Sequence, residues 1–164
     1  VVAVECDDER LDRANRQILS LASSCIEASQ EFKLILSSNA ALDRLYQQMM
    51  VDPDFRGMPW SDIKLWKLNN SGDDELFTAI SLHSGVPEDS VCSEPACEWV
   101  RNNADILFDC CICDVTDINT LEEDIVSRCN SFVILSEDRD DLLASQGFAS
   151  GKTIFWFTKT IDLT

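Results

Sequence analysis

The sequence predicts an α/β fold, with a mostly parallel, Rossmann-like sheet and helices on both faces. Short apolar runs of four to eight residues, typical of buried strands, alternate with amphipathic stretches whose apolar residues recur at helical spacing. Strands separated by helices are joined by right-handed crossovers, which produce a parallel sheet covered on both faces. The 164 residues contain no internal repeat, linker or low-complexity tract, so we expect one domain over residues 1–164.

Six apolar runs are predicted to be strands, because turn-forming or polar residues bound each of them. The run at 106–113 is the longest. The run at 32–36 is followed by Ser37, Ser38 and Asn39, which are expected to form a turn and a helix N-cap. The predicted strands cover residues 1–4, 32–36, 63–68, 106–113, 132–135 and 153–158.

Five stretches have the apolar spacing of helices. The longest, at 8–30, has Asp7 and Asp8 at its start, where acidic side chains favour a helix through capping and the helix dipole. The helix at 73–83 is expected to stop near Gly85 and Pro87. The predicted helices cover residues 8–30, 41–49, 73–83, 95–102 and 121–128.

The chain is strongly acidic, with a net charge of −17. Such a surface repels phosphate backbones and anionic lipids, so we expect no direct contact with nucleic acid or membrane. A basic protein partner matches this charge, and solubility alone is the alternative explanation. No apolar run approaches the roughly 20 residues of a membrane span, and the N-terminus lacks the basic region of a signal peptide. The chain does not begin with Met, which suggests a domain of a longer protein, and the oligomeric state stays open.

Eight cysteines are present, and we expect them to be reduced and structural. Because side chains alternate along a strand, Cys111 and Cys113 are predicted to share one face of the sheet, with Cys110 on the other. The five-residue separation of Cys92 and Cys97 is not a zinc-site spacing, so we predict neither a metal nor a cofactor. Reduced cysteines indicate an intracellular, cytoplasmic protein, with the nucleus as an alternative.

Several segments together resemble the 6-phosphogluconolactonase family, relatives of glucosamine-6-phosphate isomerase. The segments are the opening strand and helix, then residues 32–39, 60–66, 74–91, 108–113 and 151–154. The resemblance implies the family's fold over nearly the whole chain, with a carboxyl end that stops short of the family's last strands and helix. It also implies a sugar-phosphate site on three turns. These carry a Ser-Gly-Gly phosphate turn, an Asp-Glu-Arg motif, and an Asp-Gly-His motif whose histidine is the general base.

All three turns depart from those motifs. Ser37-Ser38-Asn39 stands at the Ser-Gly-Gly turn, where glycine would let backbone amides approach a phosphate. Leu68-Asn69-Asn70 replaces Asp-Glu-Arg, and Asp117-Ile118-Asn119 replaces Asp-Gly-His. A general base at neutral pH is usually a histidine, and the only histidine, His83, falls in a different helix. We therefore predict no catalytic residue.

The candidate positions of a degenerate ligand site are Ser37, Ser38, Asn39, Asp114, Asp117 and Lys152. Acidic residues dominate the end of the long strand, and a phosphate there would meet Coulomb repulsion of about 1 to 4 kcal/mol per charge. Lys152 alone does not offset them. The first hypothesis is a non-catalytic domain, a pseudoenzyme, that binds or scaffolds proteins. The alternatives are a surviving enzyme, either a divergent 6-phosphogluconolactonase of the pentose phosphate pathway or one that uses new acidic chemistry from Asp114, Asp117 and Glu122, and a sugar-phosphate sensor without turnover.

The remaining acidic and aromatic residues are expected to have no special chemistry. The acids after the long strand match no calcium-loop spacing, so we predict a solvated acidic rim. The tryptophans are expected to pack in or near the core, and interface anchors are the alternative. The run at 137–141 is predicted to be a solvated charged turn that could also dock a basic partner.

Overall fold

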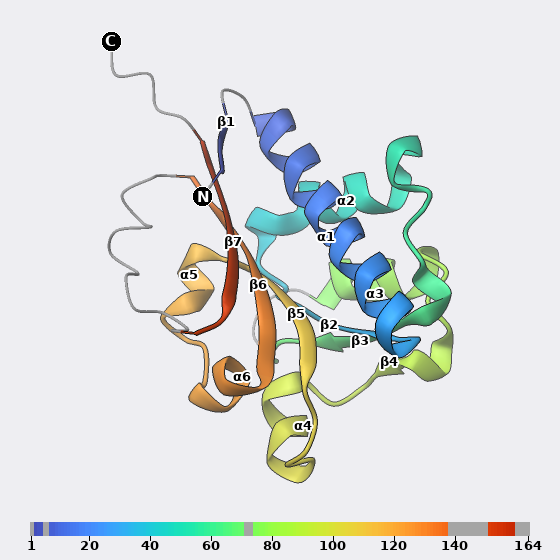
Figure 1. Ribbon diagram of the computed structural model, residues 1–164, viewed down its shortest axis with the longest axis vertical. Helices are drawn as coiled ribbons and strands as arrows, with labels where there is room; N and C mark the ends of the chain where they lie inside the picture. The colour runs from blue at the N-terminus through green and yellow to red at the C-terminus, as the bar shows by residue number, and fades with distance from the viewer. Residues whose placement is uncertain (1, 5–6, 71–73, 138–150, 160–164) are drawn as a thin grey trace.

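Parallel strands build the sheet of the computed structural model, which describes residues 2–4, 7–70, 74–137 and 151–159. Within these residues, seven strands lie in the order β1-β7-β6-β5-β2-β3-β4, and every neighbouring pair is parallel (Figure 1). The predicted α/β architecture is therefore confirmed. The strands are β1 (Val2–Val4), β2 (Phe32–Leu36), β3 (Ile63–Lys67), β4 (Val91–Cys92), β5 (Phe108–Asp114), β6 (Cys129–Ser136) and β7 (Thr153–Lys159).

Helices cover both faces of this sheet, as the sequence predicts (Figure 1). One face carries α1 (Asp7–Ser29), α2 (Asp43–Val51) and α3 (Asp74–His83). The opposite face carries α4 (Ala96–Asn102), α5 (Val115–Ile118) and α6 (Glu123–Arg128). Short 3-10 helices complete the connections: η1 (Ala40–Leu42), η2 (Pro53–Phe55), η3 (Trp60–Asp62) and η4 (Glu88–Ser90). Over the described ranges, no helix has the length and apolar character needed to cross a membrane.

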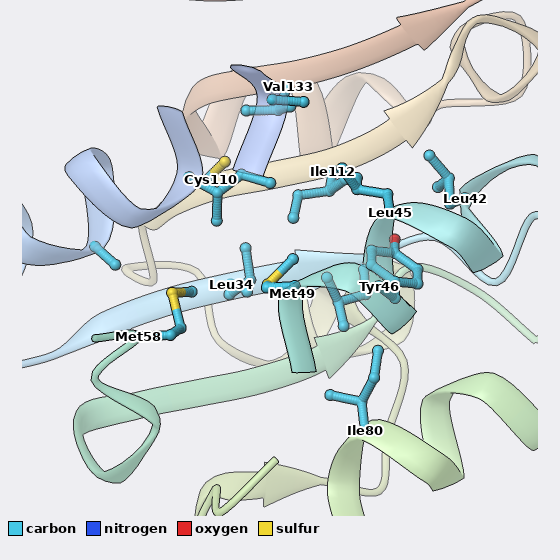
Figure 2. Packing of buried hydrophobic residues seen from close by; sticks show 14 of the residues in the cluster. Leu34, Leu42, Leu45, Tyr46, Met49, Met58, Ile80, Cys110, Ile112 and Val133 are labelled. Carbon is cyan, nitrogen blue, oxygen red and sulfur yellow. The ribbon is translucent and has the colours of Figure 1, made fainter. Parts of the chain in front are cut away.

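The hydrophobic core has two halves, one on each side of the sheet, because neighbouring strand residues point to opposite faces. Figure 2 shows the half beneath α1, α2 and α3, which contains Leu34 of β2, Ile112 of β5 and Tyr46 of α2. Cys110 lies in this half, whereas Cys111 and Cys113 lie in the other, so the predicted division of the cysteines is confirmed.

Two tryptophans lie in the second half of the core. Trp66 is 2% exposed and meets Phe108 edge-on, with ring centroids 5.1 Å apart. Trp156 is also buried. Both positions agree with the predicted packing role.

The differences from the predicted elements concern short or irregular pieces. The long strand begins at Phe108 and not at residue 106, and a single-turn helix, α5, follows it. Four residues are too few to show an apolar period, which explains why the sequence did not indicate α5. The two-residue strand β4 was missed for the same reason, and the last predicted helix begins at Glu123.

Other boundaries move by a few residues. The strand predicted at 132–135 extends to Cys129–Ser136, because the parallel ladder with β5 continues over that length. The first helix ends at Ser29, and Gln30 has a positive φ of 65°. Val1, Asp73 and residues 138–141 of the predicted charged turn lie outside the described residues.

Candidate functional site

The chain diverges toward the two faces of the sheet between β2 and β5, which are neighbours. From β2 it continues into η1 and α2 on one face, and from β5 it continues into α5 on the other. In open α/β sheets, ligands bind in the crevice that such a divergence opens at the carboxyl ends of the strands. The structure brings most of the predicted site residues to this edge: Ser37, Ser38, Asn39, Asp114 and Asp117.

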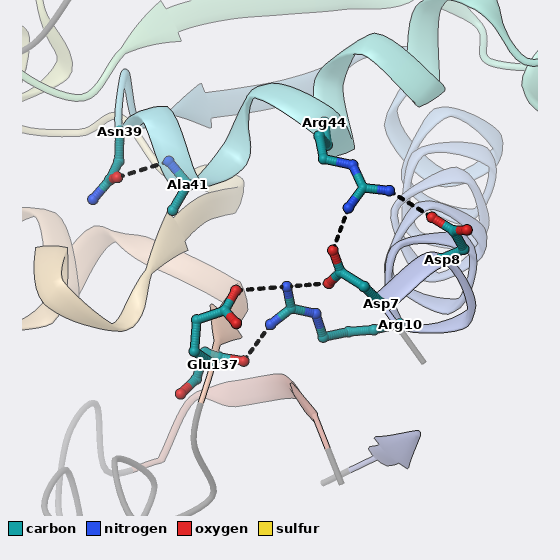
Figure 3. Close-up of polar contacts among 8 residues, drawn as sticks. Asp7, Asp8, Arg10, Asn39, Ala41, Arg44 and Glu137 are labelled. Carbon is teal, nitrogen blue, oxygen red and sulfur yellow. Dashed lines mark hydrogen bonds and ion pairs between the residues drawn. The ribbon is translucent and has the colours of Figure 1, made fainter. Parts of the chain in front are cut away.

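The turn after β2 is held by hydrogen bonds to its own atoms and to α2. The Asn39 backbone N–H donates to Ser37 Oγ over 3.2 Å, and the Tyr46 hydroxyl donates to the Ser37 carbonyl over 2.9 Å. Asn39 caps η1, since its Oδ1 accepts from the Ala41 backbone N–H over 3.0 Å (Figure 3). Asn39 has an extended backbone with φ −69° and ψ 128°, which a residue other than glycine adopts without strain. The predicted turn and N-cap at residues 37–39 are therefore confirmed, with Asn39 as the capping residue.

The turn after β5 is a capping box. Asp114 is 6% exposed, and its Oδ1 accepts from the Thr116 backbone N–H over 2.9 Å and from Thr116 Oγ1 over 2.8 Å. In return, Asp117 Oδ2 accepts from the Asp114 backbone N–H over 2.8 Å. Both carboxylates therefore stabilise the start of the short helix α5.

One side-chain hydrogen bond crosses between the two turns. Asn39 Nδ2 donates to Thr116 Oγ1 over 2.9 Å, and that hydroxyl in turn donates to Asp114. The polar groups on the two sides of the divergence are thus bonded to one another.

The turn after β3 carries Leu68-Asn69-Asn70, at the position where the resemblance implies the Asp-Glu-Arg motif. Leu68 is buried in the second half of the core. Asn70 Nδ2 donates to Glu98 Oε1 of α4 over 2.9 Å. This turn therefore contributes an apolar side chain and an amide where the resemblance implies a charged motif.

A cluster of charged residues at the same edge was not predicted from the sequence (Figure 3). At its centre is Arg10, which is 4% exposed. Its guanidinium donates to Asp7 Oδ1 over 2.6 Å, to Glu137 Oε1 over 3.0 Å and to the Ser136 carbonyl at the end of β6. Arg44 joins the cluster by ion pairs to Asp7 and Asp8.

This Arg10 cluster, formed by Asp7, Asp8, Arg10, Arg44 and Glu137, has three carboxylates and two guanidiniums. Its charges sum to −1 when each group is ionised. The cluster therefore brings no net positive charge to a phosphate at this edge. The only sequence signal for it is the spacing of Asp7 and Arg10, which suits an i,i+3 ion pair on a helix.

The structure does not bring Lys152 to this edge. Lys152 immediately precedes β7, so it lies at the amino ends of the parallel strands, and its Nζ donates to the Ser127 carbonyl over 2.7 Å. Glu122 is also engaged elsewhere, in an ion pair with Arg101 at 2.9 Å. His83 is the exposed last residue of α3.

The buried thiols have strongly raised pKa values. Burial raises the pKa of Cys110 well above its usual value and that of Cys129 to about 12. For Cys111, a hydrogen bond with Cys113 and burial together raise the pKa. These thiols stay protonated at neutral pH, whereas metal binding and nucleophilic chemistry require a thiolate. Across the described residues, no group of three or more Cys, His, Asp or Glu side chains is arranged to hold a metal.

A cavity of about 340 Å³ opens beside Ser38, between α2 and α3. Asp43 and Gln47 of α2 line one wall, and Glu75 and Leu76 of α3 line the other. Two carboxylates at its walls make this cavity unfavourable for an anion and suitable for a cation.

Comparison with known proteins identifies the fold. No protein-family model and no curated protein match the chain. Among solved structures, the 6-phosphogluconolactonase from Thermotoga maritima matches with a TM-score of 0.68 and 14% identity, over 97% of this chain and 99% of that one. The enzyme from Shewanella baltica matches with a TM-score of 0.67 and 9% identity, over 96% of both chains. The enzyme from Leishmania guyanensis matches with a TM-score of 0.67 and 12% identity, over 96% of this chain and 95% of that one.

These alignments cover nearly all of the compared chains, so the predicted shortening of the carboxyl end finds no support in them. Identities of 9 to 14% are too low to transfer an activity, and they establish the fold alone. The chain has the fold of the 6-phosphogluconolactonases.

Proposed function

We propose that this chain is a non-catalytic domain with the 6-phosphogluconolactonase fold, which binds a protein and does not hydrolyse a sugar-phosphate lactone. The observation that carries the proposal is the hydrogen bonding between the turn after β2 and the turn after β5. Asn39, Thr116 and Asp114 form a continuous chain of hydrogen bonds there. A ligand entering between these turns would have to replace those bonds with its own.

The proposal is supported by the residues at the position of the Asp-Gly-His motif. Asp117 accepts a hydrogen bond within its own turn, and Ile118 is 9% exposed and packs in the core. Asn119, where the resemblance implies the general base, is the exposed C-cap of α5. A carboxamide does not take a proton from water near neutral pH, so this turn lacks a group suited to activate a hydrolytic water.

Charge also argues against a sugar-phosphate ligand and for a protein partner. The two guanidiniums of the Arg10 cluster are paired with three carboxylates, and Lys152 lies at the other edge of the sheet. The net charge of −17 would attract a basic protein and accelerate its association at low salt.

A turnover assay tests the loss of activity. The purified chain is incubated with 6-phosphogluconolactone at neutral pH, and the Thermotoga maritima lactonase serves as the positive control in the same assay. We expect hydrolysis at the uncatalysed rate. Turnover in the usual range of enzymes, on the order of 1 to 10³ s⁻¹, would overturn the proposal and support the divergent lactonase.

Calorimetry with 6-phosphogluconate distinguishes the proposal from a sensor. We expect no binding heat at millimolar ligand, because the described residues at this edge carry no surplus of positive charge. A micromolar Kd without turnover would replace the protein-binding proposal with the sugar-phosphate sensor.

A further inference from the structure

The sheet ends at β4, which has a neighbouring strand on one side only. Within the described residues, β4 is the last strand of the sheet and pairs with β3 alone (Figure 1). An edge strand presents backbone N–H and C=O groups that its own sheet does not use, and these groups pair readily with another extended chain. No backbone hydrogen bond joins Val91 or Cys92 to a turn or loop in the part of the chain that the structure describes. The outer side of β4 is therefore open to a further strand.

A groove of about 620 Å³ lies beside this open edge, between β4 and α3. Phe77, Ser81 and Leu82 of α3 line one side of it, and Val91 and Cys92 of β4 line the other. Val91 packs on the α3 face of the sheet and Cys92 packs on the opposite face, so the groove follows the edge itself. Its volume is within the usual range of binding pockets.

The α3 side of the groove offers apolar surface. Leu82 is 71% exposed, and Phe77 and Val91 are only partly buried. An apolar side chain placed against them would remove this surface from water. When a peptide adds a strand to a sheet edge, its backbone hydrogen bonds supply affinity and pockets for alternate side chains supply specificity. The groove between β4 and α3 combines an open edge with such an apolar wall.

The charges around the groove indicate the kind of segment that fits it. Glu88 lines the groove, and Glu88 and Asp89 are both exposed in η4, just before β4. Glu94 follows β4 by two residues, so acidic side chains stand at both ends of the strand. Residues 84–100 contain no lysine or arginine, and Lys67 in the lining already makes an interaction of its own. A second copy of this chain would bring the same carboxylates to the edge, so charge favours a basic partner over self-pairing.

We propose that the groove between β4 and α3 binds an extended segment of a protein partner, with an apolar centre and lysine or arginine residues at its ends. The segment adds a strand to the open edge of β4, places an apolar side chain against Leu82, and directs its basic residues toward Glu88 and Glu94. The inference rests on the proposed protein-binding function and names the surface and the chemistry of the partner. The net charge of −17 favours the approach of such a segment.

Fluorescence anisotropy with the labelled peptide Lys-Lys-Val-Thr-Val-Lys-Lys tests this site at 50 and 150 mM salt. We expect the wild type to bind it, and the same peptide with its three central residues N-methylated to bind roughly tenfold more weakly, because it cannot donate backbone hydrogen bonds. A peptide with glutamates in place of the lysines should not bind. No binding of the lysine peptide at millimolar concentration, or equal binding of its N-methylated form, would overturn the proposal.

Leu82→Ser removes the exposed apolar side chain of the groove. Val51→Ser is the matched control, since Val51 is 75% exposed at the end of α2. We expect about a fivefold loss of peptide affinity for Leu82→Ser and less than about twofold for Val51→Ser. Equal affinities of the two variants would contradict a role for the α3 wall.

The double variant Glu88→Gln with Asp89→Asn tests the acidic end of the edge. Glu27→Gln with Asp105→Asn removes two exposed carboxylates elsewhere, so both proteins keep the same net charge. We expect roughly a tenfold loss of peptide affinity in the first variant at 50 mM salt, a smaller loss at 150 mM, and less than about twofold in the second. Matching losses would mean that the overall acidity of the chain binds the peptide, and would refute this site.

These outcomes are separate from the activity test. Lactonase turnover by the wild type would refute the proposed function, whatever the peptide does. A natural partner that copurifies equally with the wild type and Leu82→Ser would leave the protein-binding function standing and refute this groove. A wild-type dimer that Leu82→Ser dissociates in sedimentation experiments would assign the edge to a second copy of this chain, and would also overturn the proposal.

Discussion

Asn39 donates a hydrogen bond from Nδ2 to Thr116 Oγ1 over 2.9 Å, and this bond joins the turn after β2 to the turn after β5. The two residues are 77 positions apart in the sequence and meet because β2 and β5 are adjacent parallel strands. The same asparagine caps η1 with its Oδ1. The Asn39 side chain therefore stabilises its own turn and also links the turn after β2 to the turn after β5.

Asn39→Ala is expected to destabilise the protein by about 1 kcal/mol, mainly through loss of the cap. A double-mutant cycle with Thr116→Ala isolates the bond between the turns. Urea unfolding of the four proteins should give a coupling energy of about 0.5 to 1 kcal/mol. Thr116→Ser keeps the hydroxyl and serves as the near-neutral control. Strictly additive costs in the cycle would show that the two turns are energetically independent.

Arg10→Met is expected to cost about 2 to 4 kcal/mol of stability, because it leaves the Ser136 carbonyl without this donor and removes the charge between Asp7 and Glu137. Arg13→Met is the matched control, since Arg13 pairs with Glu9 in the same helix but is 50% exposed. That pair should contribute less than about 0.5 kcal/mol. Similar losses for both variants in urea unfolding would contradict a central role for the buried guanidinium.

Much of the fold is predictable from sequence because its strands are buried on both faces. Continuous apolar runs such as 32–36 stand out between amphipathic helices, and alternation along β5 assigns Cys110 and Cys111 to opposite faces. The short helix α5 has no apolar period, but the spacing of Asp114 and Asp117 is that of a capping box. That local signal was available, but the two residues were interpreted as part of an acidic rim and as candidate ligand-site positions.

The site was less predictable because it depends on contacts between distant residues. Arg10 has the sequence context of an exposed helix residue, and it is buried by the end of β6, 126 residues later in the chain. Lys152 was placed among the candidate site residues from a family resemblance. The predicted strand at 153–158 already placed Lys152 before its strand, and the parallel register shows that it therefore lies at the opposite edge.

Gln30→Gly is expected to stabilise the protein by about 0.5 to 1 kcal/mol. Gln30 follows the last residue of α1 with φ 65°, a conformation that glycine adopts without the strain of a Cβ. Its backbone N–H donates to the Ile26 carbonyl over 2.8 Å, and glycine keeps that bond. Gln30→Ala is the control and should give little or no gain, because alanine retains the Cβ. Equal stability of both variants in thermal unfolding would contradict the strain at this position.

Stability is expected to fall above about pH 9 because of the buried thiols. Burial raises the pKa of Cys129 from 9.0 to about 12, so the unfolded chain loses this proton at lower pH than the folded one. The stability that the protonated Cys129 thiol contributes is complete below pH 9. It declines by up to about 1.4 kcal/mol per pH unit as the pH rises toward 12. Cys129→Ala should therefore flatten the decline measured by urea unfolding between pH 8 and 10.5. Val133→Ala, a buried substitution on the same strand that removes no thiol, should lower stability without changing the slope. If Cys129→Ala and the wild type gave parallel pH profiles, the Cys129 thiol would not be the group whose ionisation opposes the folded state.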